Sequence, residues 1–575
     1  MDDILITVII LIATAVFVVA IFKRLHLSPV LGYLVSGALI GDHAFKVVTY
    51  EQTSVLGEMG VVFLLFAIGL ELSIERLKAM RRYVFGLGSM QVLITSVVIA
   101  GAVMLIMGDY NSAIIISGGL ALSSTAIVMQ VIAETKSQSM QVGRVALAIL
   151  LLQDFVVVPL LVIVPLLGNG DSAGYLPYLL GGTLLKAVVA LVVIFVAGRV
   201  FLRPLFAFIS QNDNESSELP IAVTLLVVLT ASWETQHFGL SLALGAFVSG
   251  VLVAETDFRG KAEESIYPFK SLLLGLFFMS VGMKIDVMEM YEQLTKIITF
   301  SIALILLKFV IISALCILFG FNKAVAVHAG LLLSQGGEFA FILFGLGKDH
   351  GVLDEGIANI LLLVVTCTMA LTPLLAAIGQ KFAENIERGL GRTPNQIIEY
   401  GARDLAGHVI IAGFGNVGRI TAKVLEAEGI NYIAVDANDD VVREAVSNGL
   451  PVFKGDASHI DTLIALGASR ATSVVLTINN EITIKKISKV IGSKFDNLEL
   501  IVRAKNFKNS TDLYSMGIDT IIPQDCELGL QLGSAVLKSV GIGEYEINRI
   551  KGQFRNGNYV IVKQEDALVE AEEDE

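Results

Sequence analysis

The stretch Ala146-Leu-Ala-Ile-Leu-Leu-Leu-Gln-Asp-Phe-Val-Val-Val-Pro159 is an apolar run with a single carboxylate, Asp154, near its centre. Ionisable side chains are costly at bilayer depth, and where they occur they are functional candidates. A carboxyl group removed from water resists ionisation, so Asp154 can hold a proton and a monovalent cation in turn. Gln153 beside it is uncharged, which leaves one titratable group and predicts one-for-one, electroneutral exchange. A hydrogen bond between helices without any transport role is the alternative.

Apolar runs of this kind recur from Ile4 to Ile378 in blocks of roughly 18–25 residues, the length of a helix that crosses a bilayer. Hydrophobic residues make up 54% of the 575-residue chain and charged residues only 17%. Soluble domains usually carry about 25% charged residues, so the composition predicts a membrane protein. About thirteen spanning helices are expected from block length. They centre near residues 13, 37, 63, 95, 121, 154, 191, 227, 247, 276, 307, 335 and 366.

Basic residues gather in alternate gaps between these blocks. Because cytoplasmic loops carry the excess of Lys and Arg, we expect a multi-pass protein of the cell inner membrane with its N-terminus outside. The chain then emerges into the cytoplasm after Lys381. The basic gaps contain Lys23, Arg24, Arg76, Lys78, Arg81, Arg82, Lys136, Arg144, Arg199, Arg203, Arg259, Lys261, Lys270 and Lys323.

Small and polar residues interrupt two other blocks, at Leu122-Ser-Ser-Thr-Ala126 and at Leu333-Ser-Gln-Gly-Gly-Glu-Phe339. Interrupted helices in matching positions of two repeats are typical of a transporter binding site. Blocks one to six and eight to thirteen match at an odd offset of seven, which predicts inverted repeats whose breaks meet near Asp154. Close packing through small residues is the alternative. The predicted ion- and proton-binding residues are Asp154, Gln153, Ser123, Ser124 and Thr125.

Three more polar residues at membrane depth are predicted to support this site. Lys308 lies within the apolar run Ile302–Ile311, where it could pair with a carboxylate or steady the broken helices. Glu338 lies beside the second break, which favours a structural role over a second ion-binding carboxylate. Gln335 lies inside the same break.

The chain reads like a soluble α/β domain after about Lys381. The run His408-Val-Ile-Ile-Ala-Gly-Phe-Gly-Asn-Val-Gly-Arg419 is a short strand followed by a Gly-x-Gly-x-x-Gly turn and a helix. A second strand, Asn431–Val435, ends at an acidic residue, which is the context that a dinucleotide-binding unit requires. The alternative is a Rossmann-like fold without a ligand. The predicted nucleotide contacts are Gly413, Gly415, Asn416, Val417, Gly418, Asp436, Asp456 and Ala457.

These features predict a polytopic helical membrane domain followed by a Rossmann-like domain. The expected division is an exchanger domain at 1–381, a linker at 382–406, a regulatory nucleotide-binding domain at 407–545 and a short tail at 546–575. The net charge of −13 argues against nucleic-acid binding, and three cysteines imply no disulfide framework. The sequence has no Walker A pattern for spending ATP, so secondary transport is favoured over pumping. We expect a transporter and not an enzyme. We expect no metal other than the transported cation.

Four membrane segments and the soluble domain together carry a family resemblance. The segments are Gln153-Asp154, Ser123–Ile127, Phe269–Phe278 with Val281–Asp286, and Gly337–Phe341. They resemble the Kef-type glutathione-gated potassium efflux systems of the cation:proton antiporter-2 group. The soluble part, His408–Arg419 with Gly455-Asp456-Ala457, is similar to the regulator-of-potassium-conductance, or TrkA N-terminal, domain of those proteins. The resemblance extends to about residue 545.

The resemblance implies potassium efflux in exchange for protons, a homodimer in lipid, AMP or NAD(H) in the Rossmann site, glutathione as a regulator and a cytosolic regulatory subunit. It also implies a regulatory cytoplasmic loop at Ala262–Lys270, which contains Glu263 and Glu264. An arginine-rich segment of the family that holds glutathione carboxylates corresponds here to Arg503-Ala-Lys-Asn506. Lys505 departs from that pattern, because lysine lacks the bidentate recognition of arginine.

Three other functions are alternatives for a chain with these features. A potassium channel with the same regulatory domain needs a carbonyl filter such as Thr-Val-Gly-Tyr-Gly, which the sequence lacks. A sodium/proton antiporter of the same fold stays open, because a single carboxylate does not choose potassium over sodium. A membrane-tethered dehydrogenase is disfavoured, since no second substrate domain is visible.

Overall fold

The chain forms two compact units in a computed structural model. One unit comprises Met1–Gln138 and Val142–Leu390, and the other comprises Ser139–Gln141 and Gly391–Glu575. The structure describes residues 2–24, 29–41, 44–71, 80–135, 137, 140–168, 218–237, 242–254, 256, 259–283, 291–388, 394–495, 497–505, 513, 518 and 520–556. The predicted block near residue 191 lies outside these ranges, as do Arg76, Lys78, Lys136, Arg199, Arg203, Asp286 and Asn506.

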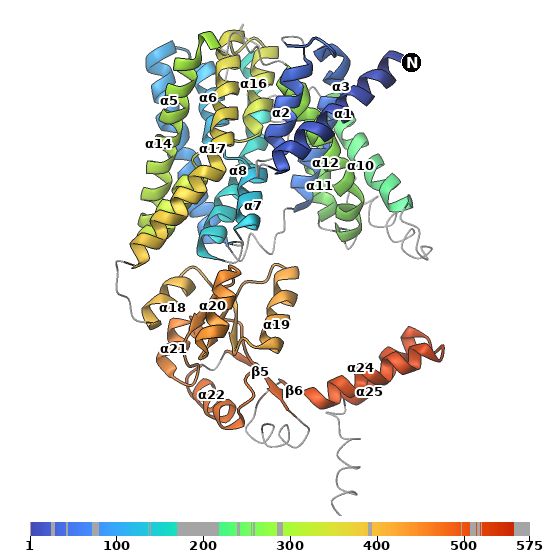
Figure 1. Cartoon of the computed structure of the whole chain (residues 1–575), viewed down its shortest axis with the longest axis vertical. Helices are drawn as coiled ribbons and strands as arrows, with labels where there is room; N and C mark the ends of the chain where they lie inside the picture. Colours follow the sequence, from blue (N-terminus) through green and yellow to red (C-terminus); the bar gives the residue numbers. More distant parts are fainter. Residues whose placement is uncertain are drawn as a thin grey trace, which may run out of the picture. The chain divides into compact units, whose positions relative to one another are not determined.

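The first unit is entirely helical in its described part (Figure 1). Apart from the block near 191, each predicted apolar block corresponds to a helix or to two helices joined at a break. The helices are α1 (Asp2–Arg24), α2 (Pro29–Ile40), α3 (Tyr50–Glu71), a π-helical turn (Tyr83–Gly88) that leads into α5 (Ser89–Met107), α6 (Tyr110–Ala121), α7 (Thr125–Glu134), α8 (Gln141–Gly168), α10 (Glu218–His237), α11 (Leu242–Ala254), α12 (Arg259–Met283), α14 (Leu294–Leu318), α15 (Lys323–Leu332), α16 (Phe339–Asp349) and α17 (Glu355–Arg388). By length and composition, five spans of the described part are long and apolar enough to cross a bilayer.

Helices of this unit associate in two groups. In one group α1–α3 pack with α10–α12, and in the other α5–α7 pack with α14–α17. The first group relies on glycine for close approach of backbones. A Cβ added at Gly37 of α2 would lie 2.0 Å from the carbonyl oxygen of Met279, and one at Gly69 of α3 would lie 2.3 Å from that of Phe247. Any larger side chain would therefore push these helices apart, which is the packing expected of small residues in membranes.

The second unit is built around a parallel six-stranded sheet with the strand order β3-β2-β1-β4-β5-β6. All four residues of the central strand β1 are buried, as expected when helices cover both faces of a parallel sheet. The doubly wound α/β fold is confirmed. The strands are β1 (Val409–Ala412), β2 (Tyr432–Asp436), β3 (Val452–Lys454), β4 (Ser473–Leu476), β5 (Glu499–Ala504) and β6 (Thr520–Pro523), and the helices include α19 (Asn416–Ala427), α20 (Asp439–Ser447), α21 (Ile460–Ala465) and α22 (Glu481–Lys494).

The boundaries of the second unit differ from the predicted linker and tail. Helix α17 continues past Lys381 to Arg388, and a further helix, α18 (Pro394–Ala402), follows. Ile398 and Ala402 are fully buried in the core of the α/β unit, so these residues belong to that unit. At the other end, α24 (Gln524–Ser539) is followed by α25 (Glu544–Asn556), which includes the start of the predicted tail. Both differences arise because short amphipathic helices carry too little local apolar signal to stand out from a polar segment.

Candidate functional site

Two broken helices meet in the membrane unit. Helix α6 ends at Ala121 and α7 begins at Thr125, while α15 ends at Leu332 and α16 begins at Phe339. The Ser123 hydroxyl in the first break donates to the Leu333 carbonyl oxygen in the second at 2.8 Å. A Cβ added at Gly337 would lie 2.8 Å from the Ser123 carbonyl, so the two backbones are in contact there. The meeting of the breaks that the sequence predicts is present in the structure.

Lys308 of α14 binds the backbone that follows the C-termini of the half-helices α6 and α15. Its ammonium donates to the Leu122 carbonyl at 2.8 Å, to the Ser123 hydroxyl at 3.0 Å and to the Gln335 carbonyl at 2.6 Å. These contacts use all three donors of the ammonium, and the side chain is fully buried. Helix C-termini carry partial negative charge, so one cation stabilises two half-helices. Of the two roles expected for Lys308, the geometry shows the one of steadying the broken helices.

We call the place where the two breaks meet the crossing. Glu338 lies on the other side of the crossing from Lys308, at the N-terminus of α7. Its Oε1 accepts from the backbone N–H of Ala126 in the first turn of α7 at 3.4 Å, and the residue is 2% exposed. The Ser124 hydroxyl caps the same helix by accepting from the Ile127 N–H at 3.2 Å. Helix N-termini carry partial positive charge, which a carboxylate offsets. Lys308 and Glu338 thus complement the two ends of the same crossing.

Asp154 of α8 lies beside the start of α7. It is 5% exposed, and its Oδ1 accepts a hydrogen bond from the Thr125 hydroxyl at 3.1 Å. A buried carboxylate and a hydroxyl offer oxygen atoms of the kind that bind a cation or accept a proton, and the nearby half-helix N-terminus favours the ionised carboxylate. Asp154 and Thr125 are thus brought together as predicted.

Gln153 ties α8 to the first break from the neighbouring position. Its Oε1 accepts from the Ser123 N–H at 2.8 Å, and its Nε2 donates to Oε1 of Gln91 at 2.8 Å. Sequence reasoning missed Gln91 and its neighbour Thr95 of α5, both of which are fully buried. Their signal is visible in retrospect, because two polar residues four positions apart on an apolar helix lie on one face.

Gln335 lies in the second break with no exposed surface. Its backbone carbonyl binds Lys308, but within the described residues neither atom of its side-chain amide has a hydrogen-bond partner. The next residue, Gly336, donates its N–H to the Thr368 hydroxyl of α17 at 3.2 Å, a support that sequence reasoning also missed. Because the Gln335 amide makes no hydrogen bond among the described residues, its oxygen and nitrogen are available to a polar ligand in the break.

In the Gly-x-Gly-x-x-Gly turn of the α/β unit, each of the three positions favours glycine for a different physical reason. Gly413 has φ of +93°, a conformation that other residues rarely adopt. A Cβ at Gly418 would lie 2.4 Å from the Gly413 carbonyl, so this position holds α19 close to the strand. A Cβ at Gly415 meets nothing within 4 Å, and with Asn416 it leaves the N-terminus of α19 open. This arrangement fits a pyrophosphate at a helix N-terminus.

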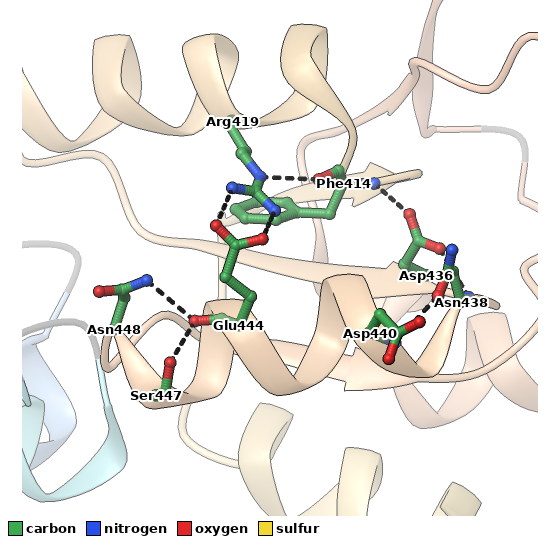
Figure 2. Close-up of polar contacts among 8 residues, drawn as sticks. All are labelled: Phe414, Arg419, Asp436, Asn438, Asp440, Glu444, Ser447 and Asn448. Carbon is green, nitrogen blue, oxygen red and sulfur yellow. Dashed lines mark hydrogen bonds and ion pairs between the residues drawn. The ribbon is translucent and has the colours of Figure 1, made fainter.

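Asp436 at the end of β2 stabilises this turn by accepting backbone hydrogen bonds. Its Oδ2 accepts from the Phe414 N–H at 2.6 Å and its Oδ1 from the Asn438 N–H at 2.8 Å (Figure 2). Arg419, one residue after the motif, reaches the Phe414 carbonyl at 3.4 Å and forms a two-pronged ion pair with Glu444 of α20. These hydrogen bonds raise the pKa of Arg419 and lower the pKa of Glu444.

The other predicted nucleotide contacts lie beside the motif. Val417 is half-buried in the first turn of α19. Partial burial opposes ionisation of Asp456, but hydrogen bonds from Ser458 and the charges of His459 and Lys486 together outweigh it and lower the pKa of the carboxyl group. Ala457 is 3% exposed and belongs to the hydrophobic core, so only its backbone could meet a ligand.

The predicted regulatory residues are arranged differently from expectation. The segment Ala262–Lys270 was expected to be a loop, but it lies within α12, with Glu263 and Glu264 exposed on the helix. Arg503 donates to the side chains of Asn479 and Gln524 and to the Thr477 carbonyl, so its guanidinium already joins β4, β5 and β6. Lys505 is exposed and lines a pocket with Arg503.

Comparison with known proteins places both units. Residues 10–377 match the family described as "Sodium/hydrogen exchanger, transmembrane", and residues 409–524 match the TrkA-N domain family. A solved structure, the sodium proton antiporter MjNhaP1 from Methanocaldococcus jannaschii, is similar with a TM-score of 0.52 and 17% identity, over 67% of this chain and 97% of that chain. At this identity the likeness concerns the fold alone.

Curated relatives resemble the chain along almost its whole length. It is 40% identical over 553 residues to the chloroplastic K(+) efflux antiporter 2 of Arabidopsis thaliana, which covers 95% of this chain and 47% of that protein. The chain spans about half the length of the two Arabidopsis relatives that it matches. It is 34% identical over 568 residues to the glutathione-regulated potassium-efflux system protein KefC of Klebsiella pneumoniae, which covers 98% of this chain and 90% of that protein. The chain therefore belongs to the Kef-type potassium-efflux antiporters, a transporter family that joins a sodium/hydrogen exchanger membrane unit to a C-terminal TrkA-N domain.

Proposed function

We propose that this chain exchanges potassium for protons across a membrane, one for one. The observation that carries the proposal is the burial of Asp154 at the meeting of two broken helices whose ends are already complemented by Lys308 and Glu338. A cation or a proton on Asp154 leaves the charge of the crossing the same in both loaded states. Potassium as the cation is supported by the names of the relatives, which are potassium-efflux proteins.

Relative movement of the two groups of helices would account for transport. Lys308 and both breaks lie in the group that contains α5–α7 and α14–α17, and α8, which carries Asp154, packs against α5. The glycine-packed group holds α2 and α12 tightly together. Movement of one group relative to the other would expose the same site to each side in turn, as rigid-body alternating access requires. Gln335 and Thr125 would then travel with Asp154 and keep the ligand set intact.

Proton movement in proteoliposomes tests the exchange and its stoichiometry. A potassium gradient should drive proton movement at a rate that does not change when the membrane potential is clamped, because no net charge crosses. A sodium gradient of equal size is the control for the cation. Faster exchange with sodium would make the chain a sodium/proton antiporter of the same fold, and a rate that follows the clamped voltage would contradict one-for-one exchange.

We propose that AMP or NAD(H) occupies the turn Gly413–Gly418. The open N-terminus of α19 suits the phosphates, and the Asp436 carboxylate suits ribose hydroxyls while repelling a 2′-phosphate. Each Asp436 oxygen accepts one backbone N–H and has a further lone pair for a ribose hydroxyl. When bound, the nucleotide would supply ligand-dependent regulation of transport.

Gly415→Asp should weaken AMP and NADH binding by roughly 100-fold, because a carboxylate there faces the phosphates and such repulsion costs several kcal/mol. Asp436→Ala should cost less, about 10-fold, through the loss of ribose hydrogen bonds. Isothermal titration of both variants and of the parent measures this. Gly492→Asp, at a position of α22 with nothing within 4 Å of an added Cβ, is the matched control. Unchanged affinity in Gly415→Asp would rule out a nucleotide at this turn.

We further propose that the α/β unit restrains transport in a homodimer of the cell inner membrane, with the N-terminus outside, and that a ligand such as glutathione relieves it. The engagement of Arg503 by Asn479 and Gln524 leaves Lys505 as the exposed cation of its pocket. A cytosolic regulatory subunit is a further proposed partner. A ligand can act in this way only by favouring the released arrangement.

Truncation after Arg388, where α17 ends, should leave a folded and constitutively active exchanger. At a typical coupling of 1–3 kcal/mol, release raises activity by roughly 5–150-fold. Charge reversal of Glu263 and Glu264, both exposed on α12, should mimic this in part. Potassium efflux from cells, normalised to the amount of protein in the membrane, is the measurement. A well-expressed truncation without efflux would mean that the α/β unit is required for transport, and restraint would be the wrong description.

A further inference from the structure

Two side-chain amides form a directional chain of hydrogen bonds across three helices. The Ser123 N–H donates to Oε1 of Gln153 at 2.8 Å, Nε2 of Gln153 donates to Oε1 of Gln91 at 2.8 Å, and Nε2 of Gln91 donates to the Ala121 carbonyl at 3.2 Å. Gln91 is fully buried and Gln153 is 1% exposed. The chain therefore runs through the interior of the unit, where an unpaired amide is costly.

Backbone groups at both ends determine which way each amide points. The Ser123 N–H can only donate, so it must face the oxygen of Gln153. The Ala121 carbonyl can only accept, so it must face the nitrogen of Gln91. The hydrogen bond between the two amides can then run in one direction only, from the nitrogen of Gln153 to the oxygen of Gln91. A second donor contact, from Gln91 Nε2 to the Thr95 hydroxyl at 3.2 Å, agrees with this orientation.

These hydrogen bonds join the end of α6 and the beginning of the first break to α8. Ala121 is the last residue of α6 and Ser123 lies two residues further on, inside the break, so Gln91 and Gln153 hold this stretch of backbone against α8. Asp154 directly follows Gln153, Thr125 lies two residues after Ser123, and the two make the contact between carboxylate and hydroxyl at 3.1 Å. The distance between these two oxygen ligands thus depends on the amide chain immediately behind them.

We propose that Gln91 is a positioning residue for the cation site and, through Gln153, sets the preference between potassium and sodium. Gln91 holds Gln153 against the Ser123 N–H, and this fixes the spacing of the Asp154 and Thr125 oxygens. The two cations differ chiefly in radius, so a change of ligand spacing alters their relative affinities. The proposal rests on the exchange function proposed above and extends it to the residue behind the ligands.

Gln91→Leu tests the proposal in proteoliposomes with potassium or sodium gradients. We expect KM for potassium to rise about 10-fold, the scale of a lost buried hydrogen bond, with little change in kcat. The ratio of kcat/KM for potassium over sodium should fall by a similar factor. Gln130→Leu is the matched control. It also replaces a glutamine by leucine, but Gln130 of α7 bonds to Glu134 and takes no part in the hydrogen bonds between Gln91 and Gln153.

Gln91→Glu keeps the shape and tests the direction of the hydrogen bonds. Its protonated carboxyl group accepts from Gln153 and donates to the Ala121 carbonyl, as the amide does, whereas the ionised form cannot donate. We therefore expect KM for potassium near that of the parent at acidic pH and a rising ratio of the two KM values as pH increases. Asp154, Glu338 and Lys308 face the same crossing, and comparison with the parent at each pH removes the effect of their own titration.

A double-mutant cycle with Gln153→Leu shows whether Gln91 acts through Gln153. The effect of Gln91→Leu on KM should largely disappear in the Gln153→Leu background. Equal loss of kcat for both cations with unchanged KM, or full additivity of the two variants, would overturn the positioning role. Should Gln91→Leu fail to fold, Gln91→Glu decides, because a constant ratio of KM values across pH would also overturn it. A parent protein without cation-driven proton movement would instead show that the proposed exchange function is wrong, and the inference would fall with it.

Discussion

Asp154→Asn is expected to reduce cation-driven proton movement to the level of empty liposomes while the protein remains folded. Asparagine has the same shape and can still accept the Thr125 hydrogen bond through its amide oxygen, so the contact at 3.1 Å has a substitute. It has no proton to exchange and no negative charge to bind a cation. The change therefore removes the alternation between two loaded states without opening a cavity.

Proton movement under potassium and under sodium gradients, together with thermal unfolding in detergent, measures the two halves of this expectation. Asp109→Asn is the matched control. Asp109 caps α6 by accepting from the Asn111 and Ser112 N–H groups, and asparagine caps helices about as well as aspartate. Exchange near the parental rate in Asp154→Asn would remove Asp154 from the mechanism, whichever cation is used.

Lys308→Met is expected to abolish exchange and to lower the free energy of unfolding by roughly 3–5 kcal/mol, the range for breaking a buried charged network. Methionine fills similar volume but donates nothing to the Leu122 and Gln335 carbonyls. Both C-terminal half-helix ends then lose their cation. Lys308→Arg should restore only part of the stability, because a planar guanidinium cannot reproduce three converging bonds from one nitrogen.

Lys296→Met is the matched control, since Lys296 lies on the same helix, is exposed and bonds only locally to Gln293. Thermal unfolding compares the variants, and hydrogen exchange should show faster exchange in α6 and α15 of Lys308→Met than in α2 and α12. A variant that unfolds at the parental temperature with both breaks still protected would show that Lys308 does not hold the crossing.

Local patterns were enough to predict much of this protein. Each apolar block that spans a bilayer carries its own signal in length and composition, so the helices of the membrane unit were predictable one by one. The breaks at Ser123 and at Gln335 were predictable because small and polar residues interrupt otherwise apolar runs. The Gly-x-Gly-x-x-Gly turn was predictable because Gly413 and Gly418 serve backbone geometry within a few residues of the chain.

Contacts between distant residues were decided only by the tertiary structure. Lys308 reaches Leu122 from 186 positions away in the chain, and no local pattern shows that its ammonium meets both breaks at once. Gln91 and Thr95 share one face of α5, but that local pattern does not show that Gln153 of α8 packs against the Gln91 amide. Helix α18 was mistaken for a linker because its burial depends on the sheet beneath it. Local patterns predict helices and strands because the interactions that form them join residues close in the chain. These contacts join residues distant in the chain, so they depend on how the completed helices and sheets pack together.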